Sequence, residues 1–542
     1  MPFYPTHLTV LQTAAILHPS ANAFRVPEVE TGTNTIRSWR AITYSQFLRD
    51  VEHTAAYWTE VLTAEGVHPP SVVGLWLSGM TYVDALHIYG ISRAGYVPQL
   101  MSLRLPNPDV ILELLEQSGG RALIYDTSFS AVVRSGSVPM HVAVDPRDIT
   151  VSDVPLPPIQ EGSRSEDPVM IFHTSGSTSG RPKLVPCSHS WWANMMAKAA
   201  TVLRPKRSQP DARDVFVWMG SLCHMAQAFM LVGTLQHGSC MVQSTQQAYP
   251  TEEFLDMVNR CGVTRVNIFP PLLAVHLRNS RKDPVVLAAL QGLDQILIAG
   301  LTMSQEDQQW VQSQGIKVLD CYASTEVAIM MTSDRGVEGN RLPPLRPNSG
   351  GSYKFMPIIP AAAASESGYQ NIHAHLVELI VLADSPDCPD VSLRHADGDY
   401  HTGDLFLEVA PGGYVFCGRD DDWIKSENSL RCDTKAIEDN VRIVCDDLVS
   451  NCVVVGNGRP TPALFVEPAR DGDAQKLRQE IFRRIRPFHA RRYLHERVAS
   501  ADSIFVVDRG VLPRTATKGN IRRRAVEQAF KAELDRLFGV VH

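Results

Sequence analysis

The sequence predicts an α/β fold with a large layered N-terminal domain and a small α+β C-terminal domain. Short apolar runs such as residues 71–77 and 121–125 alternate with helical patterns, which is typical of buried strands packed against helices. The chain has 542 residues, more than a single domain of roughly 150 residues would need. The pattern changes near residue 420, so we expect the domains to span residues 1–419 and 420–542.

Further strands are predicted along the N-terminal domain. Four apolar runs lead into a polar loop, proline or glycine, and they lie at residues 169–172, 263–269, 295–299 and 316–321. Such runs indicate parallel strands with functional loops at their ends. Residues 376–382 and 414–417, which follow a Pro-, Gly- and Ala-rich stretch, also have strand character, and we expect them to be strands of a smaller β unit.

The predicted C-terminal domain follows a charged segment. Residues 418–423 concentrate charge at the end of a strand, and we place a hinge at Asp421. Beyond it, an Arg-rich helix is expected from about Asp473.

Composition and charge exclude several classes of protein. Lys plus Arg total 51 and Asp plus Glu total 58, so the net charge is −7, which argues against a nucleic acid as partner. Ten cysteines without a C-x-x-C pair indicate reduced, structural thiols rather than a zinc or disulfide framework. There is no basic leader and no unbroken run of about 18 apolar residues, so we expect a cytoplasmic protein without a membrane span.

A loop dense in hydroxyl groups and glycine follows the run at 169–172. Residues 173–183 read His-Thr-Ser-Gly-Ser-Thr-Ser-Gly-Arg-Pro-Lys. Glycine lets the backbone approach phosphates, hydroxyls and N–H groups donate hydrogen bonds, and Lys183 adds positive charge. Leu184 follows that lysine, so the Gly-Lys-Ser/Thr ending of a P-loop is missing. A flexible surface turn is the alternative interpretation.

Four further motifs follow this loop in a fixed order. They are Tyr-Ala-Ser-Thr-Glu at 322–326, Asp-Tyr-His-Thr-Gly-Asp at 399–404, Gly-Arg-Asp-Asp at 418–421 and Pro-Arg-Thr-Ala-Thr-Lys at 513–518. Together the five motifs resemble those of the adenylate-forming (AMP-binding) superfamily, which includes acyl-CoA synthetases, nonribosomal-peptide-synthetase adenylation domains and luciferases. The overall pattern is similar to fungal synthetase-like enzymes of secondary metabolism. The resemblance implies that the C-terminal domain is a mobile lid.

The resemblance also implies a set of site residues. Nucleotide-binding positions would be Thr174, Ser175, Gly176, Ser177, Thr178, Gly180, Lys183, His224, Tyr322, Ala323, Ser324, Thr325, Asp404, Arg419 and Lys518. Glu326 and Thr178 would hold Mg²⁺, and a hard carboxylate suits that ion. The catalytic residues would be Lys518, Glu326, Thr325 and His224, with Asp421 as the hinge.

Individual roles follow from the same resemblance. Thr325 would bond the α-phosphate and Tyr322 would pack on adenine. Asp404 and Arg419 would contact the ribose, and Lys518 would bridge the acyl carboxylate and the α-phosphate.

Each assignment has a structural alternative. Thr325 and Glu326 together fit a helix N-cap followed by a first-turn acid. Asp404 and Arg419 fit a salt bridge across a domain edge, and His224 fits a hydrogen-bonded histidine of the core.

Three departures from the family pattern bear on function. Ser179 adds one residue to the phosphate loop, Ala323 replaces a common glycine, and Asn428-Ser429 stand where many relatives have a glycine beside the thiol tunnel. Adenylation is expected to be intact, and the change at Asn428-Ser429 bears on thioester formation.

The resemblance implies ATP-dependent activation of a carboxylic acid, followed by transfer to a thiol. The segment around 221–226 is similar to that of acyl- and aryl-acid ligases, and no clear counterpart of the aspartate that holds an α-ammonium is found. We therefore expect a small-molecule substrate that is a carboxylic acid without an α-amine, and ATP, Mg²⁺ and coenzyme A as cofactors. Transfer to the phosphopantetheine of an acyl carrier protein is the first alternative. A non-catalytic nucleotide-binding relative is the second.

Overall fold

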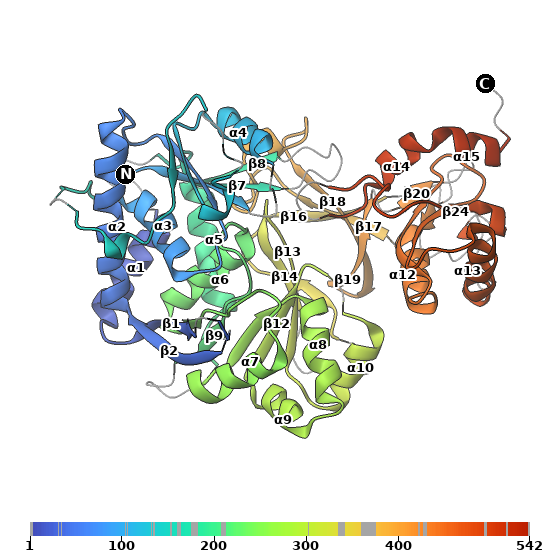
Figure 1. Cartoon of the computed structure of the whole chain (residues 1–542), viewed down its shortest axis with the longest axis horizontal. Coiled ribbons are helices and arrows are strands. Elements are labelled where there is room, and N and C mark those ends of the chain that lie inside the picture. Colours follow the sequence, from blue (N-terminus) through green and yellow to red (C-terminus); the bar gives the residue numbers. More distant parts are fainter. Residues whose placement is uncertain are drawn as a thin grey trace.

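The structure is a computed structural model of the whole chain. Its described residues are all those outside 1–3, 31, 34, 103–104, 106, 132, 134–135, 152–153, 160–163, 175–182, 207–212, 302, 334–341, 359–375, 421–422, 426–430, 491, 493–495, 516–518 and 540–542. It confirms the predicted α/β class, with a large N-terminal and a small C-terminal domain (Figure 1).

A six-stranded sheet carries the predicted phosphate loop. Its order is β6 (Met140–Val142), β5 (Ala122–Tyr125), β3 (Val72–Leu77), β4 (Val97–Ser102), β7 (Pro168–Thr174) and β8 (Lys183–Ser188). All neighbours are parallel except β7 and β8. The runs at 71–77, 121–125 and 169–172 are therefore strands, as predicted.

A second, mixed sheet contains thirteen of the described strands. Its order is β16 (Tyr353–Pro357), β17 (Leu376–Val381), β18 (Tyr400–Ala410), β19 (Gly413–Arg419), β15 (Leu345–Pro347), β14 (Ala328–Ser333), β13 (Val318–Ser324), β12 (Gln295–Ala299), β11 (Arg265–Ile268), β9 (Val215–Val217), β10 (Cys240–Val242), β1 (Asn22–Val29) and β2 (Ile36–Thr43). The central strands β9, β11, β12 and β13 are parallel, as the apolar runs predicted.

The predicted strands at 376–382 and 414–417 are confirmed, but they do not form a smaller β unit of their own. These residues form β17 and β19, which belong to the same large sheet. The chain reverses direction between β13 and β14, and β15 then pairs with both β14 and β19. The β13–β14 hairpin therefore joins the later antiparallel strands to the edge of the parallel strands, within one sheet.

Helices cover the two sheets and also lie between them. The described α-helices of the N-terminal domain are α1 (His7–Leu17), α2 (Tyr44–Ala64), α3 (Tyr82–Arg93), α4 (Pro108–Gln117), α5 (His189–Val202), α6 (Met225–Gln236), α7 (Thr251–Asp256), α8 (Pro270–Ser280), α9 (Pro284–Gly292) and α10 (Gln305–Ser313). The main core joins α1, α2, α3, α5 and α6 to both sheets. A second cluster packs α7 to α10 on the large sheet, and a third packs α4 on the small one. The layers are thus helix, sheet, helix, sheet, helix.

The C-terminal domain has its own sheets and core. A two-stranded sheet of β20 (Trp423–Lys425) and β21 (Arg431–Asp433) precedes a three-stranded sheet of β22 (Val449–Val455), β23 (Ala463–Pro468) and β24 (Ile504–Val506). Helices α12 (Thr434–Val444) and α13 (Ala474–His489) cover one face of the larger sheet, and α14 (Arg523–Ala529) and α15 (Lys531–Leu537) the other. The predicted helix is α13, capped by Asp473. Figure 1 shows these helices grouped at one end of the molecule.

The cysteines agree with the prediction of structural thiols. All ten cysteines are described and free, and nine are buried, with Cys417 partly exposed. Within the part of the chain that the structure describes, no helix is both long and apolar enough to cross a membrane.

Candidate functional site

The predicted phosphate loop connects two antiparallel strands. Thr174 ends β7 and Lys183 begins β8, and the two residues pair across the hairpin. The strand that was predicted to feed this loop is therefore present. The loop residues themselves, including Ser175, Gly176, Ser177, Thr178 and Gly180, lie outside the described residues, and their phosphate contacts remain a prediction.

His224 stands directly before helix α6, at the N-cap position, and its side chain does not cap the helix. Its Nε2 atom lies 3.4 Å from the Oγ of Ser102, the last residue of β4. This histidine is only partly buried, so it lies at the border of the core. Sequence reasoning missed Ser102, because no motif surrounds it.

A close backbone contact holds the turn that presents His224. The amide of Leu222 donates to the carbonyl of Gly79 at 2.8 Å. Ser221 Oγ donates to the carbonyl of Ser78 at 2.6 Å and accepts from the amide of Cys223 at 3.1 Å. The segment after β3 therefore supports the turn before α6.

Gly79→Ala is expected to weaken this support. Gly79 has φ +67°, and a Cβ there would lie 2.2 Å from Ser221 Oγ and 2.7 Å from the amide nitrogen of Leu222. We expect a loss of about 2–4 kcal/mol of unfolding free energy, measured by urea titration. Gly66→Ala is the matched control, because Gly66 has φ +76° with nothing within 4 Å, so about 1 kcal/mol is expected. Equal losses in the two variants would contradict the steric argument.

Thr325 and Glu326 lie in a tight hairpin, not at a helix start. Ser324 at the end of β13 pairs with Ala328 at the start of β14, and residues 325–327 form the turn between them. The N-cap alternative is therefore wrong, since the chain reverses into a strand. Ala323 and Ser324 belong to β13. The hairpin leaves the Thr325 and Glu326 side chains partly exposed at its tip.

Tyr322 and Asp404 are in direct contact. The Tyr322 hydroxyl donates to Asp404 Oδ2 at 2.5 Å, and its ring packs against Phe406 and Phe416. Burial, reinforced by the Asp404 carboxylate, raises the pKa of Tyr322. The hydroxyl therefore stays protonated and fixes the carboxylate that was predicted to bind ribose.

Asp404 and Arg419 are cross-strand neighbours on β18 and β19. Arg419 Nε lies 3.8 Å from Asp404 Oδ1, and its guanidinium donates to the Thr402 carbonyl at 3.2 Å. The salt-bridge alternative is thus found in part, but within one sheet rather than across a domain edge. The Arg419 side chain is 42% exposed, which leaves its outer face accessible to a ligand.

Tyr400 connects these residues with the hairpin. Burial raises the pKa of Tyr400, the negative charges of Glu326 and Asp404 raise it further, and Arg419 opposes them. Glu326 and the Asp404–Arg419 pair therefore act on one common tyrosine. The structure brings together the motifs at 322–326 and 399–404 and the described part of the third, residues 418–420.

The ends of the parallel strands meet beside this cluster. Phe269 follows β11, and a Cβ at Gly300, which follows β12, would lie 3.5 Å from its ring. A Cβ at Gly220, which follows β9, would lie 3.7 Å from the same ring. Ligands of open parallel sheets bind at such carboxyl ends. Sequence reasoning did not single out Phe269.

Mg²⁺ was predicted at Glu326 and Thr178. Among the described residues no group of three or more His, Cys, Asp and Glu that could hold a metal ion is found. Glu326 forms no ion pair with a described Lys or Arg, and its carboxylate suits a hard cation that also carries phosphate oxygens. Thr178, Lys518 and Asp421 lie outside the described residues.

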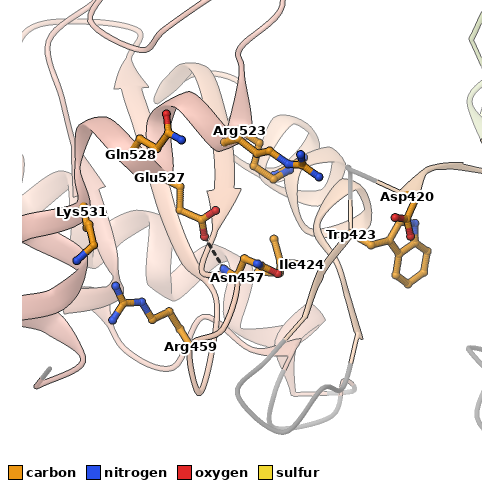
Figure 2. Close-up of a pocket in the computed structure, with 10 residues that line it drawn as sticks. Asp420, Trp423, Ile424, Asn457, Arg459, Arg523, Glu527, Gln528 and Lys531 are labelled. Carbon is orange, nitrogen blue, oxygen red and sulfur yellow. Dashed lines mark hydrogen bonds between the residues drawn. The ribbon is translucent and has the colours of Figure 1, made fainter. Parts of the chain in front are cut away.

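A cavity of about 500 Å³ opens on the C-terminal domain (Figure 2). Its lining residues are Asp420, Trp423, Ile424, Asn457, Arg459, Arg523, Arg524, Glu527, Gln528 and Lys531. Arg459 and Lys531 pair with Asp535, and Arg523 pairs with Glu438. Because most of its positive charge is balanced by nearby carboxylates, we assign no ligand to this cavity.

Comparisons with known proteins span both domains. A family model described as AMP-binding enzyme matches residues 17–353, and one described as AMP-binding enzyme C-terminal domain matches residues 421–541. The AMP-binding domain-containing enzyme iboA of Amanita muscaria (strain Koide BX008) is 36% identical over 519 residues, which cover 94% of this chain and 98% of the relative.

A further relative and a solved structure of similar fold are more distant in sequence. A 4-chlorobenzoate–CoA ligase of Arthrobacter sp. is 23% identical over 415 residues, covering 72% of this chain and 73% of the relative. The structure of the O-succinylbenzoate coenzyme A synthetase MenE of Bacillus subtilis, in complex with AMP, aligns with a TM-score of 0.74 at 18% identity. That alignment covers 96% of this chain and 98% of the other.

Proposed function

Because this chain belongs to the AMP-binding enzyme family and is an adenylate-forming ligase, we propose that it activates a carboxylic acid without an α-amine and transfers the acyl group to coenzyme A. The observation that carries the proposal is the cluster of Tyr322, Asp404 and Arg419 beside the Glu326 hairpin. A tyrosine-fixed carboxylate and a guanidinium with an accessible face are suited to the hydroxyls of a ribose.

The proposed first step is attack of the substrate carboxylate on the α-phosphorus of ATP. The bond to the leaving pyrophosphate breaks, and an acyl-adenylate remains. Thr325 donates to the α-phosphate, and Asp404 and Arg419 hold the ribose. His224 lies near the attacking carboxylate, and Tyr322 packs at the adenine. Glu326 and Thr178 would hold Mg²⁺, which when bound neutralises phosphate charge and orients its oxygens.

The phosphate loop and the lid complete this proposed site. Residues 174–178, Gly180 and Lys183 hold the β- and γ-phosphates through N–H, hydroxyl and ammonium groups. The domain at 420–542 turns about Asp421 and delivers Lys518 to the charge that develops between the carboxylate and the α-phosphate. In the second step the thiol attacks the acyl carbon, AMP leaves, and the thiol proton passes to solvent.

The primary test is carboxylate-dependent ATP–pyrophosphate exchange with fatty, aryl, keto and amino acids. Exchange with an acid that lacks an α-amine, followed by acyl-CoA formation, would support the whole proposal. Exchange without acyl-CoA would favour the phosphopantetheine of a carrier protein as acceptor. ATP binding with no exchange for any acid would favour a non-catalytic nucleotide-binding protein instead.

Glu326→Gln tests the metal role. The amide keeps the size of the side chain but removes the charge that attracts Mg²⁺, so we expect a rise of about 10–100-fold in the Mg²⁺ concentration that half-saturates exchange. The control is Glu306→Gln on α10, where the side chain is 78% exposed and pairs with Arg281. An unchanged Mg²⁺ requirement in Glu326→Gln would refute the assignment.

A further inference from the structure

A buried ion pair lies beside the hairpin that carries Thr325 and Glu326. Lys198 on α5 pairs with Asp387, which lies in the segment between β17 and β18. Their side chains are only 9% and 3% exposed. No sequence motif includes either residue, and the roles proposed above do not use them.

The carboxylate of Asp387 is enclosed on several sides. Asn194 Nδ2 donates to its Oδ1 at 2.5 Å. A Cβ at Gly351 would lie 2.4 Å from its Oδ2, so the backbone at that position approaches the carboxylate as closely as a glycine permits. The indole of Trp191 donates to the Asp387 main-chain carbonyl at 3.3 Å. The position of Asp387, and with it the pair, is therefore closely defined by its surroundings.

The ammonium group of Lys198 also reaches β14. Its Nζ donates to the carbonyl of Ile329 at 3.1 Å and lies 3.6 Å from Met330 Sδ. A buried ion pair adds little to stability compared with apolar residues of the same size, whereas loss of one partner leaves an uncompensated charge. The arrangement is therefore better suited to fixing the geometry of β14 than to stabilising the fold.

Ile329 follows the residue that closes the hairpin. Ala328 has φ +54°, the only positive value among the described residues other than glycine. It pairs with Ser324, so its conformation sets the turn at 325–327. Sparsely populated backbone conformations of this kind persist where surrounding contacts hold them. Lys198 Nζ donates to the carbonyl of Ile329, the residue that follows Ala328.

From this placement, we propose that Lys198, held by Asp387, is a positioning residue that keeps the hairpin of residues 324–328 in the geometry that presents Thr325 and Glu326. The link runs from α5 through Nζ to the Ile329 carbonyl. The part of the inference that concerns Mg²⁺ and ATP rests on the function proposed above. The part that concerns the hairpin does not depend on that function.

The test is Lys198→Met in the full chain, with two readouts. The first is amide hydrogen exchange of the segment 322–333 without ligand, where we expect exchange to become at least about tenfold faster. The second is ATP–pyrophosphate exchange, where we expect the half-saturating Mg²⁺ concentration to rise about tenfold while the KM for the acid changes less than twofold. The double variant Lys198→Met/Asp387→Leu removes both charges and serves if the single variant fails to fold. It should regain thermal stability but keep the fast exchange at 322–333.

The matched control is Arg265→Met. Arg265 forms an even more deeply buried pair with Asp214, with side-chain exposures of 1% and 0%, and it also bonds the carbonyls of Leu203 and Arg204 after α5. We expect it to lower stability without changing the segment 322–333 or the Mg²⁺ requirement. The proposal would be overturned if Lys198→Met or the double variant kept wild-type hydrogen exchange at 322–333. It would also be overturned if Arg265→Met increased the rate of hydrogen exchange there as much as Lys198→Met does. If the wild-type chain showed no pyrophosphate exchange, the proposed function would fail, and the hydrogen-exchange readout would still decide the positioning role.

Discussion

Lys518→Ala is expected to lower the rate of acid-dependent pyrophosphate exchange by about 10²–10³-fold, because a preorganised charge at the reacting phosphate is a large contribution to such transition states. ATP binding should change by less than about threefold, since in the proposed mechanism the nucleotide is held chiefly by the N-terminal domain. Exchange kinetics and equilibrium binding of ATP, measured on the same preparation, separate the two effects.

The contacts of the described residues beside Lys518 indicate that this substitution should not disturb the fold of the C-terminal domain. Thr515 accepts from Gly519 at 3.1 Å and donates to Asn520 at 2.8 Å through main-chain groups. Arg514 bonds the buried carboxylate of Glu467 at 2.6 Å. These bonds close the base of the loop without the lysine side chain, so its removal should leave the domain folded.

The control for this variant is Lys476→Ala, which removes an exposed lysine from α13 of the same domain. It should leave pyrophosphate exchange at the wild-type rate. A Lys518→Ala variant that retained more than about a third of that rate would contradict the role assigned to the lysine.

Asp320→Asn is expected to change how stability depends on pH. Asp320 lies on β13, two residues before Tyr322, and no described Lys, Arg or His forms an ion pair with it. Burial raises the pKa of Asp320 to about 7. Between about pH 4 and 7 the Asp320 carboxyl is therefore protonated in the folded protein. In the unfolded chain, where an aspartate has an ordinary pKa near 4, it is already ionised.

The sign of the effect follows from that difference. Below about pH 4 both states are protonated, and the carboxyl carries no ionisation penalty. Between about pH 4 and 7 the wild-type protein loses stability with rising pH, because only the unfolded state is ionised. Above about pH 7 the full cost of the buried charge, about 2–4 kcal/mol, is present.

Urea titrations of wild type and Asp320→Asn at pH 4.5, 6 and 8 test this expectation. The stability of the variant relative to wild type should rise with pH and level off above about pH 7. Asp502→Asn is a suitable control, because Asp502 belongs to a short helical turn of the C-terminal domain. A constant difference between Asp320→Asn and wild type across this range would show that the carboxyl titrates normally.

The sequence predicted the parallel strands well because burial on both faces leaves a continuous apolar run. The strands at 72–77 and 122–125 and the stretch at 296–299 have this character, whereas Arg265 and Asn267 interrupt the run at 265–268. The place of β17 and β19 was not predictable in the same way. Their membership in the large sheet depends on the edge that the β13–β14 hairpin leaves open for pairing. The apolar pattern of a single strand does not reveal which strand it pairs with.

The motifs predicted the chemical groups of the site but not their neighbours. Tyr322, Asp404 and Arg419 belong to three motifs, and the structure joins them in one cluster. Lys198 was visible only as a single charge in an otherwise apolar stretch of α5, which indicates a buried partner without identifying it. Its partner Asp387 is 189 positions away and Ile329 is 131 positions away, so only the folded chain reveals the contact.

The positions of the cysteines allow unfolding of each domain to be followed by thiol modification. Cys417 is the partly exposed thiol, and burial raises its pKa to about 11, so a thiol reagent at neutral pH should modify the native protein slowly. Three buried thiols, Cys432, Cys445 and Cys452, lie in the C-terminal domain, and six lie in the N-terminal layers. Pulsed alkylation followed by peptide mapping would therefore reveal, without any engineered label, which domain opens first as the protein is heated.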